Sequence, residues 1–239
     1  MKVLVFDIYG DFAHFRKYYT TTSPLTFSFP PPPTIAGILG AIYGAQKDEY
    51  LNVFGYDNCK VALRVLNPIK KMRLGINLIN TKDNRYFLLL KKKNHEPRTQ
   101  ILTEFVKSPK YRIYLWHPDA DVFNKLASMI QSHQSFYTVS LGLSELLADF
   151  SFIGVYEGKE ISNEKSEIST VVSISKLIEK GIEIQPERKY FKEKIPIKMT
   201  EGRVVEIYDD VIYEPDGKTI KAILKTFCQL ENGEHISFF

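Results

Sequence analysis

Charged, aromatic and hydroxyl side chains are concentrated in one short segment near the N-terminus of this chain. The segment supplies seven candidate nucleic-acid contacts: Arg16, Lys17, Tyr18, Thr20, Thr21, Thr22 and Ser23. Cationic groups pair with phosphates, hydroxyl groups hydrogen-bond to phosphate oxygens, and aromatic rings stack on bases. The segment therefore predicts contacts to the backbone and bases of a nucleic acid.

A strong positive charge lies in the segment from Lys60 to Arg112. It holds 14 Lys or Arg residues against Asp83, Glu96 and Glu104, a net charge of +11 in a chain whose total is +4. So local an excess is typical of a surface that binds a polyanion. The alternative is a solvated, lysine-rich hairpin without a ligand.

One set of residues has the chemistry for metal-independent RNA cleavage. Such cleavage needs a general base for the 2′-hydroxyl and a cation for the developing charge, and Tyr43, Lys93 and His95 supply these groups. We keep this site as the runner-up to an interpretation without catalysis. The five histidines are scattered, and the sequence contains no HExxH, Walker, GxSxG or GxGxxG motif, which argues against a metal site, nucleotide hydrolysis and serine-hydrolase chemistry.

A proline run and a glycine-rich helix follow the N-terminal segment. Pro30 to Pro33 predict a rigid extended strut, and Thr34 is suited to cap a helix that reaches Ala45. Its apolar face is formed by Ile35, Ile38, Leu39 and Ile42, whereas a nearly bare face is formed by Gly37, Gly40, Ala41 and Gly44. Interior glycines destabilise a helix, so we expect close approach of another backbone, from a sheet or from RNA. A tightly packed core helix is the alternative.

The order of predicted elements is β-α-β-β-α-β, which is typical of the ferredoxin-like, RRM-like α+β fold. The strands are predicted at Lys2–Tyr9, Val61–Leu66, Tyr111–Trp116 and Phe150–Tyr156, and a second helix begins after Pro118. A basic β-hairpin is expected as an insertion, with a strand over Arg85–Lys93 and a turn over Asn94–Arg98. We predict two domains, residues 1–157, with the insertion at about 68–110, and a small all-β region at 158–239.

Composition indicates where in the cell the protein is located. The two cysteines, Cys59 and Cys228, form neither a disulfide framework nor a metal cluster, which favours a reducing, cytoplasmic location. The longest apolar run, Ile35 to Ala45, is too short for a membrane span, and Asp7 interrupts any signal-peptide core. We therefore expect no membrane association.

Three long stretches resemble the fifth CRISPR-associated protein family, in its Hmari-like (type I-B) subtype, within the RAMP superfamily. They are HFRKYYTTTSPLTFSFPPPPTIAGILGAIYG, RTQILTEFVKSPKYRIYLWHP and SLGLSELLADFSF, in the first 155 or so residues. The resemblance implies an RRM-like domain with a β-hairpin thumb in a type I Cascade surveillance complex of antiviral defence. There it would bind the repeat-derived 5′ handle of the CRISPR RNA and contact the large subunit and the nearest backbone subunit, and through them target DNA. No cofactor is implied.

The resemblance also assigns roles to particular residues. The thumb would be the segment Lys70 to Lys110, and the Arg16–Ser23 segment would clamp displaced bases or the sugar backbone. Cationic candidates for handle phosphates in and beside the thumb are Lys71, Arg73, Lys91, Lys92, Lys93, Arg98, Lys110 and Arg112. Gly142 and Ser144, in a tight loop expected before a short helix, would offer backbone N–H groups to a phosphate, or serve as a plain helix cap.

The resemblance favours binding over catalysis. One subtype of the family carries a metal-independent ribonuclease that uses Tyr, Lys and His, but here Asn94 separates Lys93 from His95 and the other motifs match a subtype without this activity. A non-catalytic RNA-handle-binding subunit is therefore the leading hypothesis. The alternatives are an endoribonuclease that processes repeat RNA, and a protein-interaction module that does not bind RNA directly.

Overall fold

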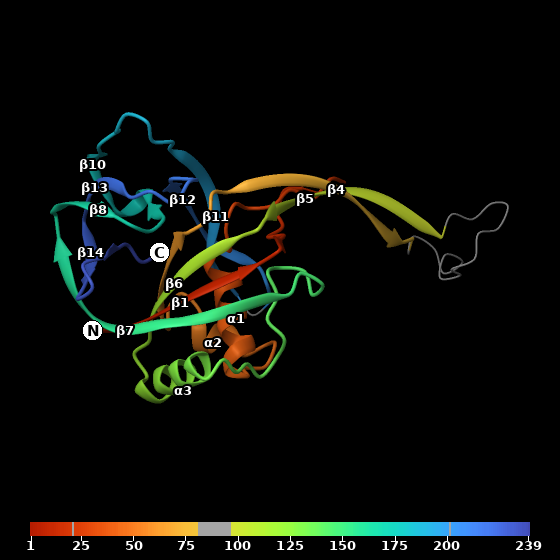
Figure 1. The fold of residues 1–239 in the computed structure, drawn as a ribbon, viewed down its shortest axis with the longest axis horizontal. Coiled ribbons are helices and arrows are strands. Elements are labelled where there is room, and N and C mark those ends of the chain that lie inside the picture. Colours follow the sequence, from red (N-terminus) through yellow and green to blue (C-terminus); the bar gives the residue numbers. More distant parts are fainter. Residues whose placement is uncertain (21, 81–96, 201) are drawn as a thin grey trace.

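The structure is a computed structural model that describes residues 1–20, 22–80, 97–200 and 202–239. Within these ranges the fold is mixed α+β, as predicted, with three short α-helices, one curled nine-stranded sheet and two three-stranded sheets (Figure 1). None of the helices in the described part of the chain is long and apolar enough to cross a membrane.

β1 (Lys2–Gly10) lies inside the nine-stranded sheet, between β6 (Lys110–Trp116) and β7 (Ala148–Ser162). β3 (Lys60–Val65) pairs with the other edge of β6, so that four strands follow the order β7-β1-β6-β3 with antiparallel neighbours. The four predicted strands of the N-terminal region coincide with these elements.

Both faces of β1 are buried, although its alternating pattern suggests a half-buried strand. Leu4, Phe6 and Ile8 belong to the core cluster that also contains the helices, whereas Val3 and Val5 pack in a second cluster with residues near the end of the chain. Strands covered on both faces carry nearly continuous apolar residues. β1 is therefore apolar on both faces because each face packs in a different hydrophobic cluster.

α1 (Pro32–Tyr43) begins two residues before the expected cap. Pro31 is the N-cap and Thr34 lies inside the helix, where its backbone N–H donates to the Pro31 carbonyl at 2.8 Å. Proline is tolerated in a first helical turn, because the first N–H groups have no intrahelical acceptor. The prediction of an extended strut is therefore wrong for Pro32 and Pro33, which form the first turn of the helix.

Two further helices pack beside α1. α2 (Tyr50–Phe54) is a short helix that sequence patterns did not indicate, and α3 (Ala120–Gln131) is the helix expected after Pro118. Asp119 caps α3, because its side chain accepts hydrogen bonds from the backbone N–H groups of residues 121 and 122 at 2.8 and 3.2 Å. This geometry explains why α3 starts where it does.

A long β-hairpin extends away from the body of the protein (Figure 1). β4 (Lys70–Ile79) pairs with β5 (Arg98–Lys107), from Lys70 opposite Lys107 to Ile79 opposite Arg98. β2 (Phe12–Ala13) joins β5 and completes a three-stranded sheet at the base of the hairpin. The strand expected over Arg85–Lys93 lies outside the described residues.

In the residues that the structure describes, the C-terminal region consists of short strands and one 3₁₀ helix. Its elements are β8 (Lys165–Ile168), β9 (Val172–Ser173), η2 (Ile174–Lys176), β10 (Leu177–Ile182), β11 (Phe191–Met199), β12 (Val205–Tyr213), β13 (Ile220–Leu224), β14 (Thr226–Leu230) and β15 (His235–Ile236). β7 runs through the predicted domain boundary at residue 157 and pairs with both β1 and β14. The nine-stranded sheet is thus continuous across that boundary, and the division into two domains stays a prediction.

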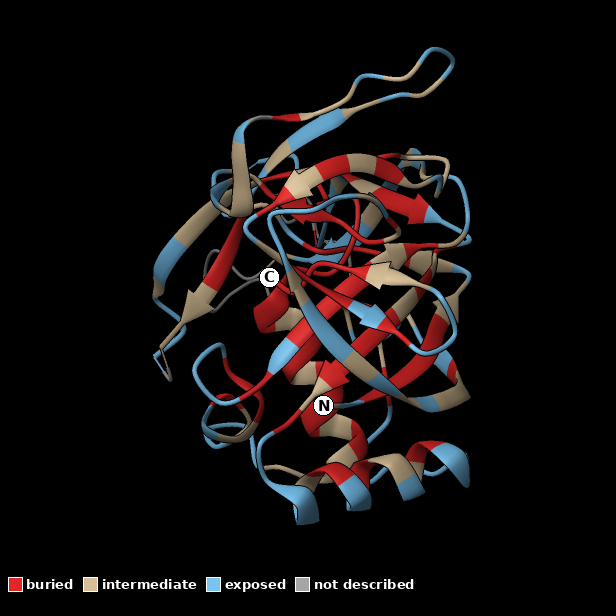
Figure 2. Ribbon diagram, turned by 90° about the vertical axis from the view of Figure 1, so that its left-hand side faces the viewer, coloured by how far each residue is buried: buried red, intermediate tan, exposed pale blue. Residues whose placement is uncertain are grey.

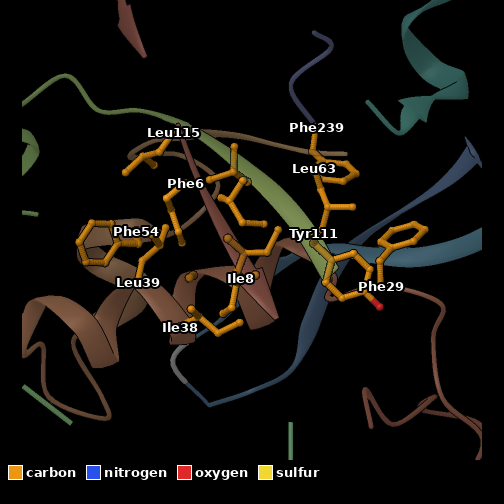
Figure 3. Packing of buried hydrophobic residues seen from close by; sticks show 14 of the residues in the cluster. Phe6, Ile8, Phe29, Ile38, Leu39, Phe54, Leu63, Tyr111, Leu115 and Phe239 are labelled. Carbon is orange, nitrogen blue, oxygen red and sulfur yellow. The ribbon is translucent and has the colours of Figure 1, made fainter. Parts of the chain in front are cut away.

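The core is built from the central strands, α1 and the strands that cover them (Figure 2). In Figure 3, Phe6 and Ile8 of β1 face Leu39 of α1 and Phe54 of α2. Ile195 of β11, which is fully buried, belongs to the same cluster. The β11-β12-β9 sheet therefore packs on the N-terminal core, and its residues Glu193 and Tyr208 contact the segment Arg16–Ser23.

Candidate nucleic-acid interface

The segment Arg16–Ser23, which we call the N-terminal loop, is held by its own hydrogen bonds. An isolated bridge joins Arg16 to Thr26, and the Arg16 guanidinium donates to the Thr20 carbonyl at 3.0 Å. The Thr20 hydroxyl donates to the Lys17 carbonyl at 2.9 Å. Thr22 and Ser23 are exposed, and Thr21 lies outside the described residues. Arg16 is therefore exposed to solvent, and its backbone and guanidinium are held by contacts with Thr26 and Thr20.

Lys17 anchors this loop to the C-terminal region. Its ammonium group forms an ion pair with Glu193 of β11 at 2.5 Å, and the two side chains are only 14% and 9% exposed. Burial alone lowers the pKa of Lys17, but the hydrogen bond and charge of Glu193 outweigh it, so that the pKa is raised. We conclude that Lys17, predicted as an RNA contact, already has an anionic partner.

A basic cleft opens where the N-terminal loop, the base of the hairpin and β11 meet. It has a volume of about 490 Å³, and its lining includes Lys17, Lys71, Lys192 and Lys194, with Glu193 among them. The rings of Tyr19, Phe191 and Tyr213 also line it. This volume lies within the usual range of ligand pockets, about 300–1,000 Å³. Lysines beside aromatic rings suit an anionic ligand that also carries flat rings.

The cationic side chains of the hairpin differ in their exposure to solvent and in their hydrogen-bond and ion-pair partners. Lys71 donates to the Thr26 carbonyl at 2.8 Å and lies 3.7 Å from Glu104, and burial lowers its pKa. Arg73 is 59% exposed and lies 3.7 Å from Glu104. Arg98 is exposed at the far end of the described hairpin. Lys91, Lys92 and Lys93 lie outside the described residues.

Arg112 and Lys110 both face Asp7 of β1. The Arg112 guanidinium binds the Asp7 carboxylate in a bidentate manner, at 2.7 and 3.3 Å, and lies 3.8 Å from Glu234. These contacts raise the pKa of Arg112, chiefly through the hydrogen bond to Asp7. The Lys110 ammonium lies 3.8 Å from the same carboxylate. The structure thus gives Arg112 a role in stabilising the sheet.

Gly142 seats a loop against the N-terminal segment. Its φ angle of +105° favours glycine, and a Cβ atom here would overlap the His14 carbonyl. The short helix expected after this loop is not formed, and an isolated bridge joins Ser140 to Leu147. Ser144 is exposed and donates to Glu145 at 3.3 Å. Helix capping is therefore excluded as the role of Gly142 and Ser144.

The bare face of α1 is partly covered by a side chain. A Cβ atom on Gly40 would lie 2.7 Å from the Cβ of Tyr50, whereas one on Gly37 would meet an atom of that ring only at 3.8 Å. Gly44 has a φ angle of +93° and packs under Phe136. Two pockets, of about 390 and 460 Å³, open over the rest of this face, and Gly37 and Arg203 line both of them. Close packing by Tyr50, rather than by a backbone, explains Gly40.

The structure describes only Tyr43 among the three runner-up catalytic residues. Tyr43 packs edge-on against Phe54 with ring centroids 5.5 Å apart, and the Lys125 ammonium lies 3.8 Å from the centre of its ring. Lys93 and His95 lie outside the described residues. Among the residues that the structure describes, no group of three or more His, Cys, Asp or Glu side chains is placed to hold a metal ion.

Sequence reasoning missed the contribution of β11 and β12. Lys192 and Lys194 alternate along β11 and reach the cleft, and Tyr208 of β12 contacts Tyr18 of the N-terminal loop. The alternation of basic residues in FKEKIPIK was a signal for a strand with one charged face. Nothing local indicated that this face meets the N-terminal loop.

Comparisons with known proteins agree with these features. The model of the family described as CRISPR-associated protein (Cas_Cas5) matches residues 3–168. A solved structure of a CRISPR protein from Archaeoglobus fulgidus resembles this chain with a TM-score of 0.58 and 14% identity, over 99% of this chain and 98% of that one. A chain of a CRISPR RNA-guided surveillance complex gives a TM-score of 0.52 and 10% identity, over 92% and 91%. No curated protein matches in sequence. The two structural likenesses show that the fold is shared.

Proposed function

The chain belongs to the CRISPR-associated protein family (Cas_Cas5), and from this premise we propose that it is a non-catalytic RNA-binding subunit of a type I Cascade complex. Its ligand is the repeat-derived 5′ handle of the CRISPR RNA, which it caps in the cytoplasm as part of antiviral defence. The observation that carries the proposal is the basic cleft, in which Lys71, Lys192 and Lys194 meet aromatic rings beside a projecting hairpin. A shared fold with a chain of an RNA-guided surveillance complex is consistent with this role.

The strand order supports the finer assignment of the fold. The order β7-β1-β6-β3, with α1 and α3 between strands in sequence, corresponds to a ferredoxin-like domain into which the β4-β5 hairpin is inserted. We propose that this hairpin is the thumb of a RAMP protein. It leaves the sheet beside the cleft, so RNA in the cleft would lie against its base.

Cations without acidic partners are the best candidates for phosphate contacts. Lys192 pairs with Asp210 at 2.8 Å, and Lys17 pairs with Glu193. Lys194 is exposed, and no ion pair to a described acidic residue involves it or Arg16. We propose Arg16 and Lys194 as the principal phosphate contacts, with Arg98 along the hairpin. Arg73, which lies 3.7 Å from Glu104, is a secondary candidate.

Binding rather than catalysis is proposed because Tyr43 is used in packing. Its ring lies between Phe54 and Lys125, in contact with α2 and α3, and it does not line the basic cleft. A 2′-hydroxyl bound in the cleft would therefore have no base at this position.

Exposed apolar residues on the hairpin support contact with other subunits. Leu74 and Leu78 are 38% and 45% exposed on one face of β4. Apolar side chains exposed on a projecting element are typical of interaction surfaces. We propose the adjacent backbone subunit and the large subunit as the partners, and target DNA as an indirect one.

Changing Lys194 to alanine is expected to weaken binding of repeat-derived RNA and to make it less sensitive to salt. One lost phosphate contact lowers the slope of log affinity against log salt by about 0.7 for single-stranded RNA. Filter binding across a salt series measures both quantities. Lys159, an exposed lysine of β7, is the matched control. Equal effects of the two changes would contradict the assignment of the cleft.

Specificity is tested on the assembled complex. RNA that co-purifies with the tagged chain is sequenced, and we expect reads that begin in the CRISPR repeat. Binding to scrambled RNA as strong as to the repeat-derived handle, in the presence of the partner subunits, would overturn the proposed function. Cleavage of repeat RNA in EDTA that disappears on changing Tyr43 or His95 would favour the nuclease instead.

A further inference from the structure

Two exposed tyrosine rings and one half-buried tyrosine ring form a cluster between two elements that are distant in sequence. Tyr18 and Tyr19 of the N-terminal loop stand at 88° with ring centroids 5.1 Å apart. The Tyr18 ring also contacts Tyr208 of β12, at 4.9 Å and 48°. We call these three residues the tyrosine platform.

The platform is not part of the hydrophobic core. Tyr18 is 53% exposed and Tyr19 is 58% exposed. In β12, Val211 and Tyr213 belong to the core cluster, whereas Tyr208 does not. Exposed rings keep apolar surface in contact with water, so a cluster of them indicates a surface that a ligand covers.

Positive charge borders the platform. The Lys194 ammonium lies 5.6 Å from the centre of the Tyr208 ring, and Arg16 is the exposed residue before Lys17 in the loop. Tyr19 itself lines the basic cleft. Rings beside cations that form no ion pair with a described acidic residue suit a strand that carries bases and phosphates together. RNA is favoured as the occupant because it would use both features, whereas an acidic protein segment would use only the cations and an apolar one only the rings.

We infer that the tyrosine platform stacks an unpaired base of single-stranded RNA, while Arg16 and Lys194 hold the phosphates beside that base. This inference rests on the proposed function and extends it, because it gives the C-terminal region a direct contact with the RNA. It also gives a reason for the ion pair between Lys17 and Glu193, which fixes the loop against β11 and so sets the distance between Tyr18 and Tyr208. A platform formed before RNA arrives lowers the ordering cost of binding.

The test combines tyrosine variants with RNA that lacks single bases. The full-length protein, alone and in the complex, is titrated with a synthetic single-stranded RNA from the CRISPR repeat, intact or with one abasic site at each position in turn. The variants are Y18A/Y19A, Y18F/Y19F and Y208A, and Y56A is the control because Tyr56 is 46% exposed outside the platform. Urea unfolding midpoints verify that the variants keep the native fold.

Stacking predicts a specific set of results. Y18A/Y19A should bind the intact RNA about 5- to 150-fold more weakly, the range expected for the loss of one base stack. Y208A should also bind more weakly, whereas Y18F/Y19F and Y56A should bind like the wild type. The salt slope should not change, because a tyrosine ring neutralises no phosphate. At one position the abasic site should weaken the wild type but not Y18A/Y19A, since both changes remove the same contact.

Other results would overturn the inference, and they separate it from the proposed function. If the wild type binds the repeat RNA and Y18A/Y19A binds equally well, or if no abasic position couples to the tyrosines, the platform is not a stacking site and the proposed function stands. A loss confined to assembly with the other subunits would make the platform a protein contact. If the wild type shows no preference for repeat RNA in any setting, the inference and the proposed function both fail.

Discussion

Replacing Arg112 with alanine is expected to lower the free energy of unfolding by about 1.5–3 kcal/mol, the usual contribution of hydrogen bonds to a charged group, because Asp7 loses its bidentate partner. The Asp7 side chain is only 6% exposed, and Arg112 binds both of its oxygens. With Arg112 removed, the nearest cation is Lys110 at 3.8 Å. Urea unfolding at neutral pH, followed by circular dichroism, measures the loss.

The matched control is Arg98→Ala. Arg98 is exposed near the described end of the hairpin, and surface substitutions of this kind usually change stability by less than about 0.5 kcal/mol. The pair also separates two roles, because Arg98→Ala should weaken RNA binding without loss of stability. If Arg112→Ala unfolds at the same urea concentration as the wild type, Asp7 does not depend on Arg112, and Arg112 is again a candidate for a phosphate contact.

Residue spacing correctly predicted the helices and strands whose conformation depends mainly on residues close to them in the sequence. The alternation in KVLVFDIY predicted β1, and the apolar spacing after Pro118 predicted α3. The proline run shows the limit of such patterns, because a proline suits both an extended segment and a first helical turn. Packing of α1 in the core decided between them.

The candidate site depends on contacts between residues distant in sequence, which local sequence patterns do not predict. The N-terminal loop was identified from its residue types, but the partner of Lys17 is Glu193 and the partner of Tyr18 is Tyr208, both of which lie in the C-terminal region. Arg112 was counted with the free cations, because its pairing with Asp7 exists only when β1 and β6 lie side by side. The positions of ion-pair partners follow from strand order, which composition and spacing leave open.

Gly142, a candidate phosphate contact, also has a role that depends on contacts distant in sequence. The resemblance to the family implied a phosphate-binding N–H group here, whereas the structure shows tight contact between loop 140–147 and the His14 backbone. The His14 N–H donates to the Leu141 carbonyl at 3.0 Å, which holds the two segments together. The absence of a side chain at Gly142 is therefore what allows the loop to lie beside the N-terminal segment that leads into Arg16.

Changing Gly142 to alanine is expected to destabilise the protein by at least about 3 kcal/mol, because a positive φ angle costs about 1–3 kcal/mol and overlap with backbone adds to it. Gly233→Ala is the matched control, since its φ angle is +86° but a Cβ atom there would meet nothing within 4 Å. It should cost only the conformational part, about 1–3 kcal/mol. Urea unfolding of both variants measures the difference, which is the cost of the overlap. Equal losses would show that the loop can move away from His14 freely, and the loop would then not fix the N-terminal segment.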